Sequence, residues 1–588
     1  MRDDRPSPAE LDALEQRALA EWLGTSDRLD DEDDGDLPGG VSAGFAERVL
    51  AAESSVLPVP VIVPIDAGPG PRLDDITGMP RPSAPRRRWG TLVGSFALAA
   101  GLGGLWLAQR PPSVREEVDT KIGSVDTETI ATVRPAAPIP DDLDEQVASY
   151  IADYGRHFGP TFEFHGAILV ARDGKVHYAQ GFGVADPAHD TANTPQTRFR
   201  IGMLTEQFTA AAILQLRDAG MLQLDDPVSE HLPGFPNGRS ITIMQLLQHS
   251  SGIPNYTDLP NFHEWKLRPH TSEQLIGRFS ELPLEFKPGE DFTPTNSGYF
   301  LLGAIIEKKS GMSYGEYMQR YVFEPLGMRD TMVGDEYGRP GQARGNVWNE
   351  EEQLDPPDPI DMSVFGAAGG IVSSIEDLAK WDSALYEGRI LARSSVEQMI
   401  EPNRFGYGFG WVVGEDQDQT VVSFPGAIDG FNSAIMRYTA DRTLVVVLCN
   451  TEIVPAGRIA SDIAMMVYGG HPPPRIEYPE VQVAPGTFSR YLGSYGITDD
   501  TIRVLGAGVD ESMFEPLQTV HVKQIGDRLY FDVPAHGSTW MHPMGRHRFF
   551  FKDNSGNYIN FTLDAEGDAT GLVVHYPDAE LELQRKGE

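Results

Sequence analysis

Two kinds of hydrophobic pattern alternate along the chain from about residue 141. In "HGAILVARDGKVHYAQGFGVAD", two apolar runs flank the polar tetrapeptide "RDGK", which predicts a β-hairpin. The segment 204–219 is apolar on nearly all sides and stops at Gly220, which is typical of a helix buried at the centre of a domain. A strand pair followed by a central helix indicates a mixed α and β domain, which we place at 141–472.

The last part of the chain, 473–588, has a different pattern. Stretches such as "VHVKQIGDRLYFDVP" and "GDATGLVVHY" alternate apolar and polar residues over short lengths and are separated by Gly, Asp and Asn. Short alternating strands with such turns predict a small antiparallel β-barrel.

The N-terminal part lacks the pattern of a folded domain but contains one long apolar stretch. Residues 1–85 are acidic and poor in apolar side chains, so we expect a mostly disordered tail. Within 86–110, the stretch 89–108 carries no charge and supplies the roughly 20 apolar residues that one membrane crossing needs. We expect a single transmembrane helix there, joined to the globular part by a linker at 111–140.

The charges beside this helix predict its orientation. Arg86, Arg87 and Arg88 precede the apolar stretch, and Trp89 and Trp106 lie at its two ends. Because basic flanks stay on the cytoplasmic side, we expect a single-pass protein of the bacterial inner (cytoplasmic) membrane. Its N-terminus is then cytoplasmic and its C-terminal domains are extracytoplasmic.

Net charge and cysteine content exclude several classes of function. A formal net charge of −38 argues against nucleic acid as a partner, because phosphates repel such a surface. The single cysteine, Cys449, excludes an internal disulfide and a thiolate metal site, and we expect it on a buried strand. His542 and His547, in "MHPMGRHR", lack metal-ligand spacing and are predicted to lie in a turn, so we expect no metal and no cofactor.

Six motifs of the 141–472 segment occur in an order known from one family. They are "TRFRIG", "ITIMQLLQHSSGIPNYTD", "TNSGYFLLGAIIEKKSGMSYGEYM", "GAAGGIVSSIEDLAKW", "YGFGW" and "GAIDGFNS". This series resembles the serine β-lactamase and penicillin-binding-protein family, in particular its class C and D-alanyl-D-alanine peptidase-like branch. The resemblance implies an α/β (α+β) fold, in which helices flank an antiparallel sheet and an all-helical region lies beside it. The C-terminal barrel resembles the lipocalin-like domain often appended to such hydrolases.

Catalysis in that family needs side chains that this chain has replaced. The family has a Ser nucleophile with a Lys three residues later, a Tyr-x-Asn loop, and a strand motif with His or Lys before x-Gly. The corresponding positions here hold Met203, Glu206, Pro294 and Phe424, of which Met and Pro can neither attack a carbonyl nor exchange a proton. Asn296 and Gly426 are the two retained positions, and we expect any binding role of the groove to involve them.

The replacements have a physical interpretation that does not involve catalysis. A glutamate in the first turn of a helix is favoured by the helix dipole by about 0.3–1 kcal/mol, whereas a lysine there is disfavoured. Met203 and Phe424 are expected to fill the groove that the active enzymes keep open. A relocated nucleophile is the alternative, with Thr205, Ser250, Ser251, Ser297 or Ser423 as the hydroxyl and His249 or Glu206 as the base. Thr205 is expected to point away from the groove, and His249 to be structural.

Two functional hypotheses follow. The first is a membrane-anchored, non-catalytic pseudoenzyme that binds, senses or acts as a scaffold at the cell envelope. Its groove would take a peptidoglycan peptide or another small ligand, and its acidic tail a cytoplasmic protein. The second is an active serine hydrolase of β-lactamase, D-Ala-D-Ala peptidase or esterase type. A weaker possibility is that "AGFAERVLAA" marks an anti-sigma-factor-like tail, although no Cys/His zinc motif accompanies it.

Overall fold

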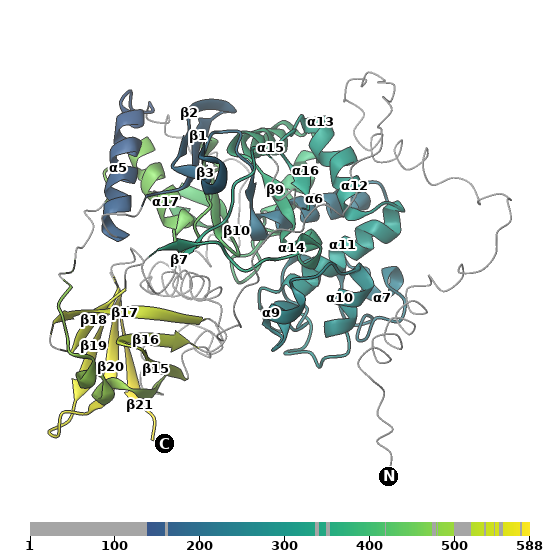
Figure 1. Ribbon diagram of the computed structural model, residues 1–588. Coiled ribbons are helices and arrows are strands. Elements are labelled where there is room, and N and C mark those ends of the chain that lie inside the picture. Colours follow the sequence, from purple (N-terminus) through teal and green to yellow (C-terminus); the bar gives the residue numbers. More distant parts are fainter. Residues whose placement is uncertain are drawn as a thin grey trace, which may run out of the picture.

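The computed structural model places most of the chain after residue 137 (Figure 1). It describes residues 138–158, 163–334, 340–348, 353–417, 419–472, 478, 480–498, 519–533, 537–545, 547–551, 557–576 and 579–587. The predicted tail, transmembrane segment and most of the linker lie outside these ranges. Within them, no helix has both the length and the apolar character needed to cross a membrane.

A six-stranded antiparallel sheet forms the centre of the larger unit. Its strand order is β10-β11-β12-β13-β1-β2. The predicted hairpin is confirmed as β1 and β2, which turn at Asp173 and Gly174, both with positive φ. The strands are β1 (Gly166–Arg172), β2 (Lys175–Phe182), β10 (Val412–Asp416), β11 (Gln419–Ile428), β12 (Phe431–Tyr438) and β13 (Thr443–Cys449).

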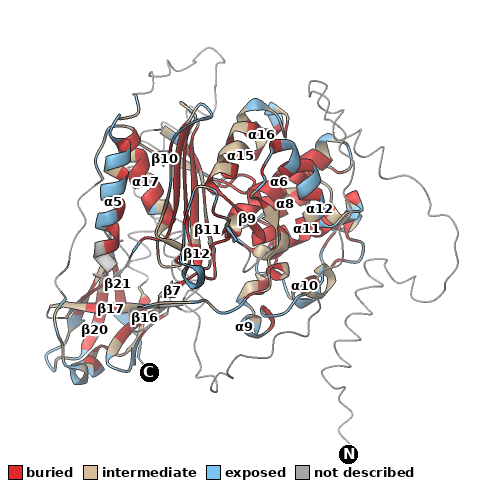
Figure 2. Cartoon of the chain, turned by 45° about the horizontal axis from the view of Figure 1, so that its top comes forward, coloured by how far each residue is buried: buried red, intermediate tan, exposed pale blue. Residues whose placement is uncertain are grey.

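Helices cover both faces of this sheet (Figure 2). On one face, α5 (Leu143–Phe158) and α17 (Ala456–Val467) bury apolar side chains against Ile168, Val445 and Val447. On the other face, α15 (Ile375–Glu387) packs against β1 and β13, and the helical region lies beyond it. Cys449 is buried on β13, as expected.

An all-helical region lies beside the sheet and carries one wall of the candidate site (Figures 1 and 2). Its longest helices are α6 and α11. The helices are α6 (Thr205–Asp218), α7 (Val228–His231), α8 (Ile243–Leu247), α9 (Phe262–Trp265), α10 (Ser272–Phe279), α11 (Asn296–Ser310), α12 (Tyr314–Met318), α13 (Glu324–Leu326), α14 (Gly366–Gly369) and α16 (Arg393–Met399). The short turns η2 (Gly202–Leu204) and η3 (Tyr256–Asp258) precede α6 and α9, and a π-helical turn spans Gln319–Phe323.

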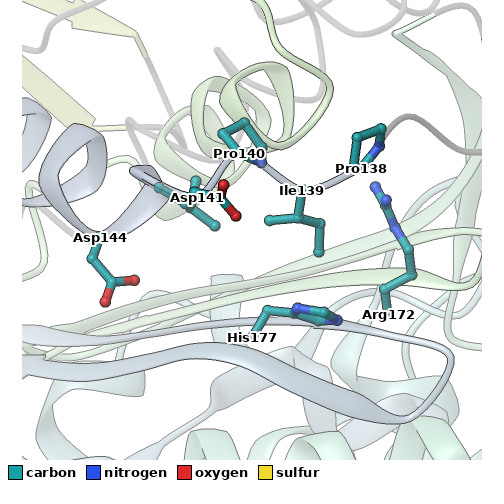
Figure 3. Close-up of a pocket in the computed structure, with 8 residues that line it drawn as sticks. Pro138, Ile139, Pro140, Asp141, Asp144, Arg172 and His177 are labelled. Atoms are coloured by element: carbon teal, nitrogen blue, oxygen red, sulfur yellow. The ribbon is translucent and has the colours of Figure 1, made fainter.

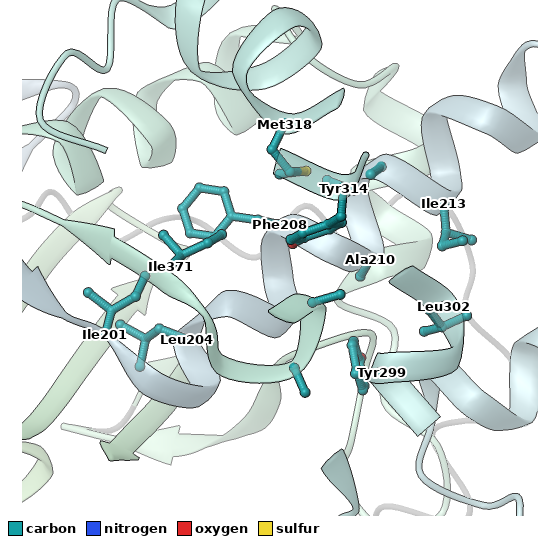
Figure 4. Close-up of a cluster of buried hydrophobic side chains, with 14 of the residues drawn as sticks. Ile201, Leu204, Phe208, Ala210, Ile213, Tyr299, Leu302, Tyr314, Met318 and Ile371 are labelled. Atoms are coloured by element: carbon teal, nitrogen blue, oxygen red, sulfur yellow. The ribbon is translucent and has the colours of Figure 1, made fainter. Parts of the chain in front are cut away.

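Helix α6 is the buried central helix that the sequence predicts. Its residues from Thr205 to Leu216 are all buried, and Gly220 follows it with a positive φ. Figure 4 shows Phe208 and Ile213 of this helix among side chains of α11, α12 and β9. Short pairings complete this unit: β3 (Val184–Asp186) with β4 (Thr191–Ala192), β9 (Ile371–Ser373) with both β5 (Phe199–Arg200) and β6 (Met332–Val333), and β7 (Val347–Trp348) with β8 (Leu354–Asp355).

The C-terminal unit is a closed eight-stranded barrel, which confirms the predicted antiparallel β-barrel. Each strand pairs antiparallel with its neighbours, and β14 also pairs with β21, so the sheet closes on itself. Apolar side chains of all eight strands pack inside it. The strands are β14 (Gly493–Ile497), β15 (Val520–Ile525), β16 (Arg528–Val533), β17 (Gly537–Gly545), β18 (Arg548–Phe550), β19 (Tyr558–Leu563), β20 (Ala569–Tyr576) and β21 (Ala579–Arg585).

The turn predicted for "MHPMGRHR" is only partly correct. His542 lies within strand β17, where the pairing with β18 shifts register between Pro543 and Gly545. His547 lies in the connection to β18 with a φ of 62°. Pro543 and Gly545 therefore lie at an irregularity of the strand pairing, where the shift in register accommodates both residues without ending the strand.

Candidate functional site

Three segments bring the motif positions together. Met203 lies in η2, immediately before α6; Phe424 and Gly426 lie on β11; and Asn296 begins α11. The contact between η2 and β11 is very close. A Cβ atom on Gly426 would lie 2.2 Å from the carbonyl oxygen of Ile201, and one on Gly202 would lie 2.7 Å from that of Ala427. Glycine is required at both positions because any side chain would separate the helix start from the strand.

Apolar side chains occupy positions 203 and 424, which the resemblance aligns with the family's nucleophile and strand cation. Phe424 is 3% exposed and packs edge-on against Tyr407, with ring centroids 5.9 Å apart. Met203 is half-buried and packs against the same core. Neither side chain offers a group that could attack a carbonyl or hold a substrate carboxylate.

Glu206, which the resemblance aligns with the family's lysine, lies in a buried cluster. Its Oε2 atom is 3.1 Å from Nε2 of His249 and 3.2 Å from the hydroxyl of Tyr407, and these two partners are 3.0 Å apart. Glu206 is 2% exposed and His249 is 1% exposed. Tyr407 comes from the "YGFGW" motif, at a distance of 201 residues from Glu206 along the chain.

The hydrogen bonds fix where the protons of this cluster lie when the imidazole is neutral. The backbone N–H of Thr295 donates to Nδ1 of His249, so the imidazole proton is on Nε2 and is directed at Glu206 and Tyr407. The Tyr407 hydroxyl then donates to Glu206. Both nitrogens of His249 are therefore engaged by partners inside the protein.

Burial controls the electrostatics of the cluster. It raises the pKa of Glu206 above its ordinary value, although the hydrogen bonds from His249 and Tyr407 oppose this effect. Burial and the neighbouring Glu206 carboxyl also raise the pKa of Tyr407. The expectation that Glu206 gains from the helix dipole is therefore incomplete. The dipole argument applies to a solvated helix end, whereas this carboxyl is removed from water.

The loop before α11 contains Pro294, which the resemblance aligns with the tyrosine of the family's Tyr-x-Asn loop. Pro294 is exposed and has no side-chain donor or acceptor. The backbone N–H of Asn296 donates to Oδ1 of Asn255, and its side-chain amide donates to Thr257 at 3.2 Å. The retained asparagine thus holds two loops of the helical region together.

Three of the five alternative hydroxyls have structural roles. Thr205 accepts a hydrogen bond from the backbone N–H of Ile371 at 3.1 Å, so its hydroxyl is held against the start of β9. Ser297 donates to the carbonyl of Pro254 and accepts from the N–H of Tyr256, and Ser251 accepts from the N–H of Ile253. Ser250 is buried beside His249. Ser423 precedes Phe424 on β11, so it faces the other side of the sheet.

Local sequence pattern does not indicate two features of the site. Tyr407, in "YGFGW", reaches Glu206 from a distant part of the chain, and the buried ion pair between Lys266 and Asp429 joins residues 163 positions apart. In "GAIDGFNS", Asp429 is a charged residue between an apolar residue and a glycine. This position is the one sequence feature that indicates a buried charge there. Among the residues that the structure places, no group of three or more His, Cys, Asp or Glu side chains forms a metal site.

A surface pocket of about 530 Å³ lies away from these positions (Figure 3). It is formed by the segment that leads into α5 together with Arg172 of β1 and His177 of β2. None of the motif positions lines it.

Comparisons with known sequences and structures agree with the sheet and helix arrangement described above. The β-lactamase family model matches residues 162–466. Penicillin-binding protein 4* of Bacillus subtilis is 28% identical over 455 residues, covering 73% of this chain and 96% of that protein. A putative penicillin-binding protein of the same organism, PbpX, is 31% identical and is covered over 80% of its length, for 58% of this chain.

A solved structure extends the similarity to both units. The octameric penicillin-binding protein homologue from Pyrococcus abyssi has a TM-score of 0.51 and 25% identity, covering 75% of this chain and 99% of that chain. Sequence motifs, sheet order and buried central helix lead to the same conclusion as these matches. The chain belongs to the β-lactamase family, with the penicillin-binding proteins among its relatives.

Proposed function

We propose that this protein is a non-catalytic member of its family, anchored in the bacterial inner membrane, that binds a ligand or partner at the cell envelope. One observation carries the proposal. The positions of the family nucleophile and its lysine hold Met203 and Glu206, and the latter is hydrogen-bonded into a buried cluster with His249 and Tyr407. Acylation needs a nucleophile that can lose a proton, which the thioether of Met203 cannot do, and the carboxyl at position 206 is already hydrogen-bonded inside the protein.

The loss extends to substrate recognition. Phe424 stands where the family places a cation for the substrate carboxylate, and Pro294 stands where it places a phenolic hydroxyl. A peptidoglycan peptide or another small ligand would therefore be held by shape and by apolar contact. Asn296 and the backbone around Gly426 are the retained polar groups of the proposed groove.

Covalent labelling tests the proposal directly. The full chain, solubilised in detergent, is incubated with a fluorescent penicillin and separately with a fluorophosphonate, and its intact mass is measured. Penicillin-binding protein 4* of Bacillus subtilis is the parallel sample that shows whether the penicillin reagent is active. We expect no adduct on the folded chain. A stoichiometric adduct would overturn the proposal in favour of an active serine hydrolase, and peptide mapping would identify the nucleophile.

The membrane anchor needs its own test. After expression, membranes are washed with alkaline carbonate, and the chain is followed in the pellet beside a variant lacking residues 86–110. We expect the full chain in the pellet and the shortened variant in the supernatant. Release of the full chain by carbonate would contradict the anchor.

A further inference from the structure

A polar cluster is buried between the central sheet and helix α15. At its centre, Nε of Arg437, on β12, donates to the carboxylate of Asp382, on α15. The guanidinium carbon of Arg437 lies 4.6 Å from the ring centroid of Tyr386 and 5.2 Å from that of Trp411. Arg437 is 1% exposed and Trp411 is 0% exposed. The cluster is therefore removed from water, and its polar atoms depend on partners inside the protein.

Gln207 of α6 belongs to the same cluster. Its side-chain carbonyl accepts a hydrogen bond from the indole N–H of Trp381 at 2.7 Å, and Trp381 precedes Asp382 on α15. The backbone of Gln207 also touches Gly410, the residue before Trp411. A Cβ atom on Gly410 would lie 2.6 Å from the backbone nitrogen of Gln207. Gln207 thus contacts the segments that carry Asp382 and Trp411.

Four side chains of the cluster carry a buried donor atom that lacks a partner. Within the described part of the chain, no hydrogen bond is formed by Nε2 of Gln207, the hydroxyl of Tyr386, Nε1 of Trp411 and Nη1 of Arg437. Three of these atoms belong to N–H groups that can only donate, and the phenol can donate as well. Buried donors without partners are costly, so folded proteins normally supply an acceptor. What the cluster lacks is therefore an acceptor.

A second arginine lies at the solvent side of the cluster. Arg442, in the turn between β12 and β13, has its guanidinium carbon 5.2 Å from the ring centroid of Tyr386, and its side chain is 53% exposed. It also acts electrostatically on the carboxyl of Asp382. Arg437 and Arg442 thus both act on the buried carboxylate of Asp382. An anion that approaches from solvent would meet Arg442 first.

Two further acids near the cluster do not cancel this positive charge. Asp441 is held by Arg172, whose Nη2 atom lies 3.4 Å from its carboxylate. Asp173 lies 3.8 Å from Arg442, but its side chain is 72% exposed, and solvent screens a pair that is so open. Two arginines therefore stand against one buried carboxylate, and one monovalent anion would balance the charges of the cluster.

From this arrangement we infer that the cluster is a binding site for chloride, with the Arg437 guanidinium and the Trp411 indole N–H as its main donors. A hydrogen bond from a guanidinium to an anion is stronger than one to a neutral acceptor. A water molecule would bring two protons of its own, whereas the side-chain oxygens of Asp382 and Gln207 already accept hydrogen bonds. Bound chloride would connect α6, α15 and β12 and so stabilise the domain. This binding needs neither turnover nor a peptide ligand, so it is independent of the proposed function.

Thermal unfolding in two salts tests the site. The full chain in detergent is unfolded in sodium chloride and in sodium gluconate at equal ionic strength, and the difference in midpoint is called the chloride increment. An ion that binds only the folded state raises the midpoint, whereas general salt effects are shared by all variants. Trp411→Phe removes the indole N–H and keeps an aromatic ring. Trp265→Phe is the matched control, because Trp265 packs against Tyr256 in the helical region.

Arg442→Gln is the second test variant, since its exposed side chain can be replaced without disturbing the packing of the cluster. Arg393→Gln is its control, because Arg393 is 90% exposed and pairs with Glu397 on α16. We expect the chloride increment to decrease by at least about half in both test variants and to keep the parental value in both controls. A folded Trp411→Phe variant with the parental increment would overturn the site. If that variant does not fold, the parental increment in Arg442→Gln would do so.

Bromide identifies the occupant directly. Bromide replaces chloride and scatters anomalously, so crystals of the full chain grown in sodium bromide show where a halide binds. We expect one bromide ion within hydrogen-bond distance of Nη1 of Arg437 and Nε1 of Trp411. A water molecule at that position, or an empty cluster, would overturn the chloride site.

Discussion

Glu206 Oε2 and His249 Nε2 lie 3.1 Å apart inside the protein, although 43 residues separate them along the chain. The resemblance aligns position 206 with the cation of the family's catalytic pair, whereas this chain has a carboxyl there whose partners are an imidazole and a phenol. A buried polar group depends on its hydrogen-bond partners, so a substitution at position 206 also affects His249 and Tyr407.

Glu206→Gln should stabilise the protein at neutral pH. Burial raises the pKa of Glu206 above 4.5, so the folded state resists ionisation of this carboxyl. Stability is then highest below the ordinary pKa and decreases as the pH rises through the raised value. Glutamine accepts the same hydrogen bonds and does not ionise. Thermal unfolding from pH 4 to pH 8 should give similar midpoints for both proteins at pH 4 and a higher midpoint for the variant at pH 8.

The matched control for this comparison is Glu397→Gln, since Glu397 is exposed and forms a surface pair with Arg393. Its unfolding midpoint should follow that of the parent at every pH. A Glu206→Gln midpoint below that of the parent at pH 8 would contradict the prediction and would mean that the ionised carboxylate stabilises the cluster.

Restoring the serine alone should not restore acylation. In Met203→Ser, the new hydroxyl lacks the lysine, and the Glu206 carboxyl is already hydrogen-bonded to His249 and Tyr407. Members of a catalytic set act together, so one restored member out of four is expected to give no measurable adduct. The readout is the intact mass after incubation with a fluorescent penicillin. A stoichiometric adduct on the introduced hydroxyl would show that the remaining groups form a functioning base.

Phe424→Ala should destabilise the larger unit by about 3–5 kcal/mol, because it leaves a cavity in a packed core. Phe424 is 3% exposed and contacts Tyr407. Val412→Ala on the neighbouring strand is the control, since Val412 is 36% exposed and should change stability by less than about 1 kcal/mol. Urea unfolding monitored by fluorescence measures both. Equal effects would mean that Phe424 does not support the core.

Gly426→Ala should be strongly destabilising, by at least about 1–3 kcal/mol, because its Cβ atom would clash with the carbonyl of Ile201 and with Ser433. Gly457→Ala provides a contrast within the same unit. Gly457 lies in α17, and a Cβ atom there would meet nothing within 4 Å. That variant is expected to be stabilised by about 0.4–1 kcal/mol. Opposite signs in the same unfolding assay are the predicted result, and two losses of similar size would contradict it.

Glu452→Gln should remove a pH dependence near neutrality. The pKa of Glu452 is raised to about 7, so the parent loses stability as the pH rises from 4.5 through 7. The variant cannot ionise and should be more stable than the parent at pH 8, with little difference at pH 4. Differential scanning calorimetry at both values measures this, and a constant difference at the two pH values would contradict the assignment.

The elements that rest on local pattern could be predicted from the sequence. The hairpin at Asp173–Gly174, the buried helix α6 and the antiparallel barrel each follow from the spacing of apolar residues and from turn residues. The six motifs also indicated the family, and this resemblance is confirmed by the match over 162–466.

The contacts between distant segments could not be predicted in the same way. Tyr407 and His249 reach Glu206 from far along the chain, so nothing near position 206 indicates that its carboxyl is buried. The same holds for Lys266 and Asp429, whose pairing depends on how the helical wall meets the β11–β12 turn. The periodicity of a helix does not show whether its end is exposed to solvent. Here tertiary packing buries the start of α6, including Glu206.

The place of β1 in the sheet has a consequence for how the chain is made. β1 pairs on one side with β2 and on the other with β13, and Arg172 and Thr443 at their ends are 271 residues apart. During synthesis, β1 and β2 are the first strands of the sheet to emerge. The edge of β1 that pairs with β13 stays unpaired until the entire helical region has been translated. Such non-local pairing is slow and leaves an exposed strand edge that favours association between nascent chains. The nascent chain is therefore most exposed to self-association, and most dependent on chaperones, before β13 has emerged.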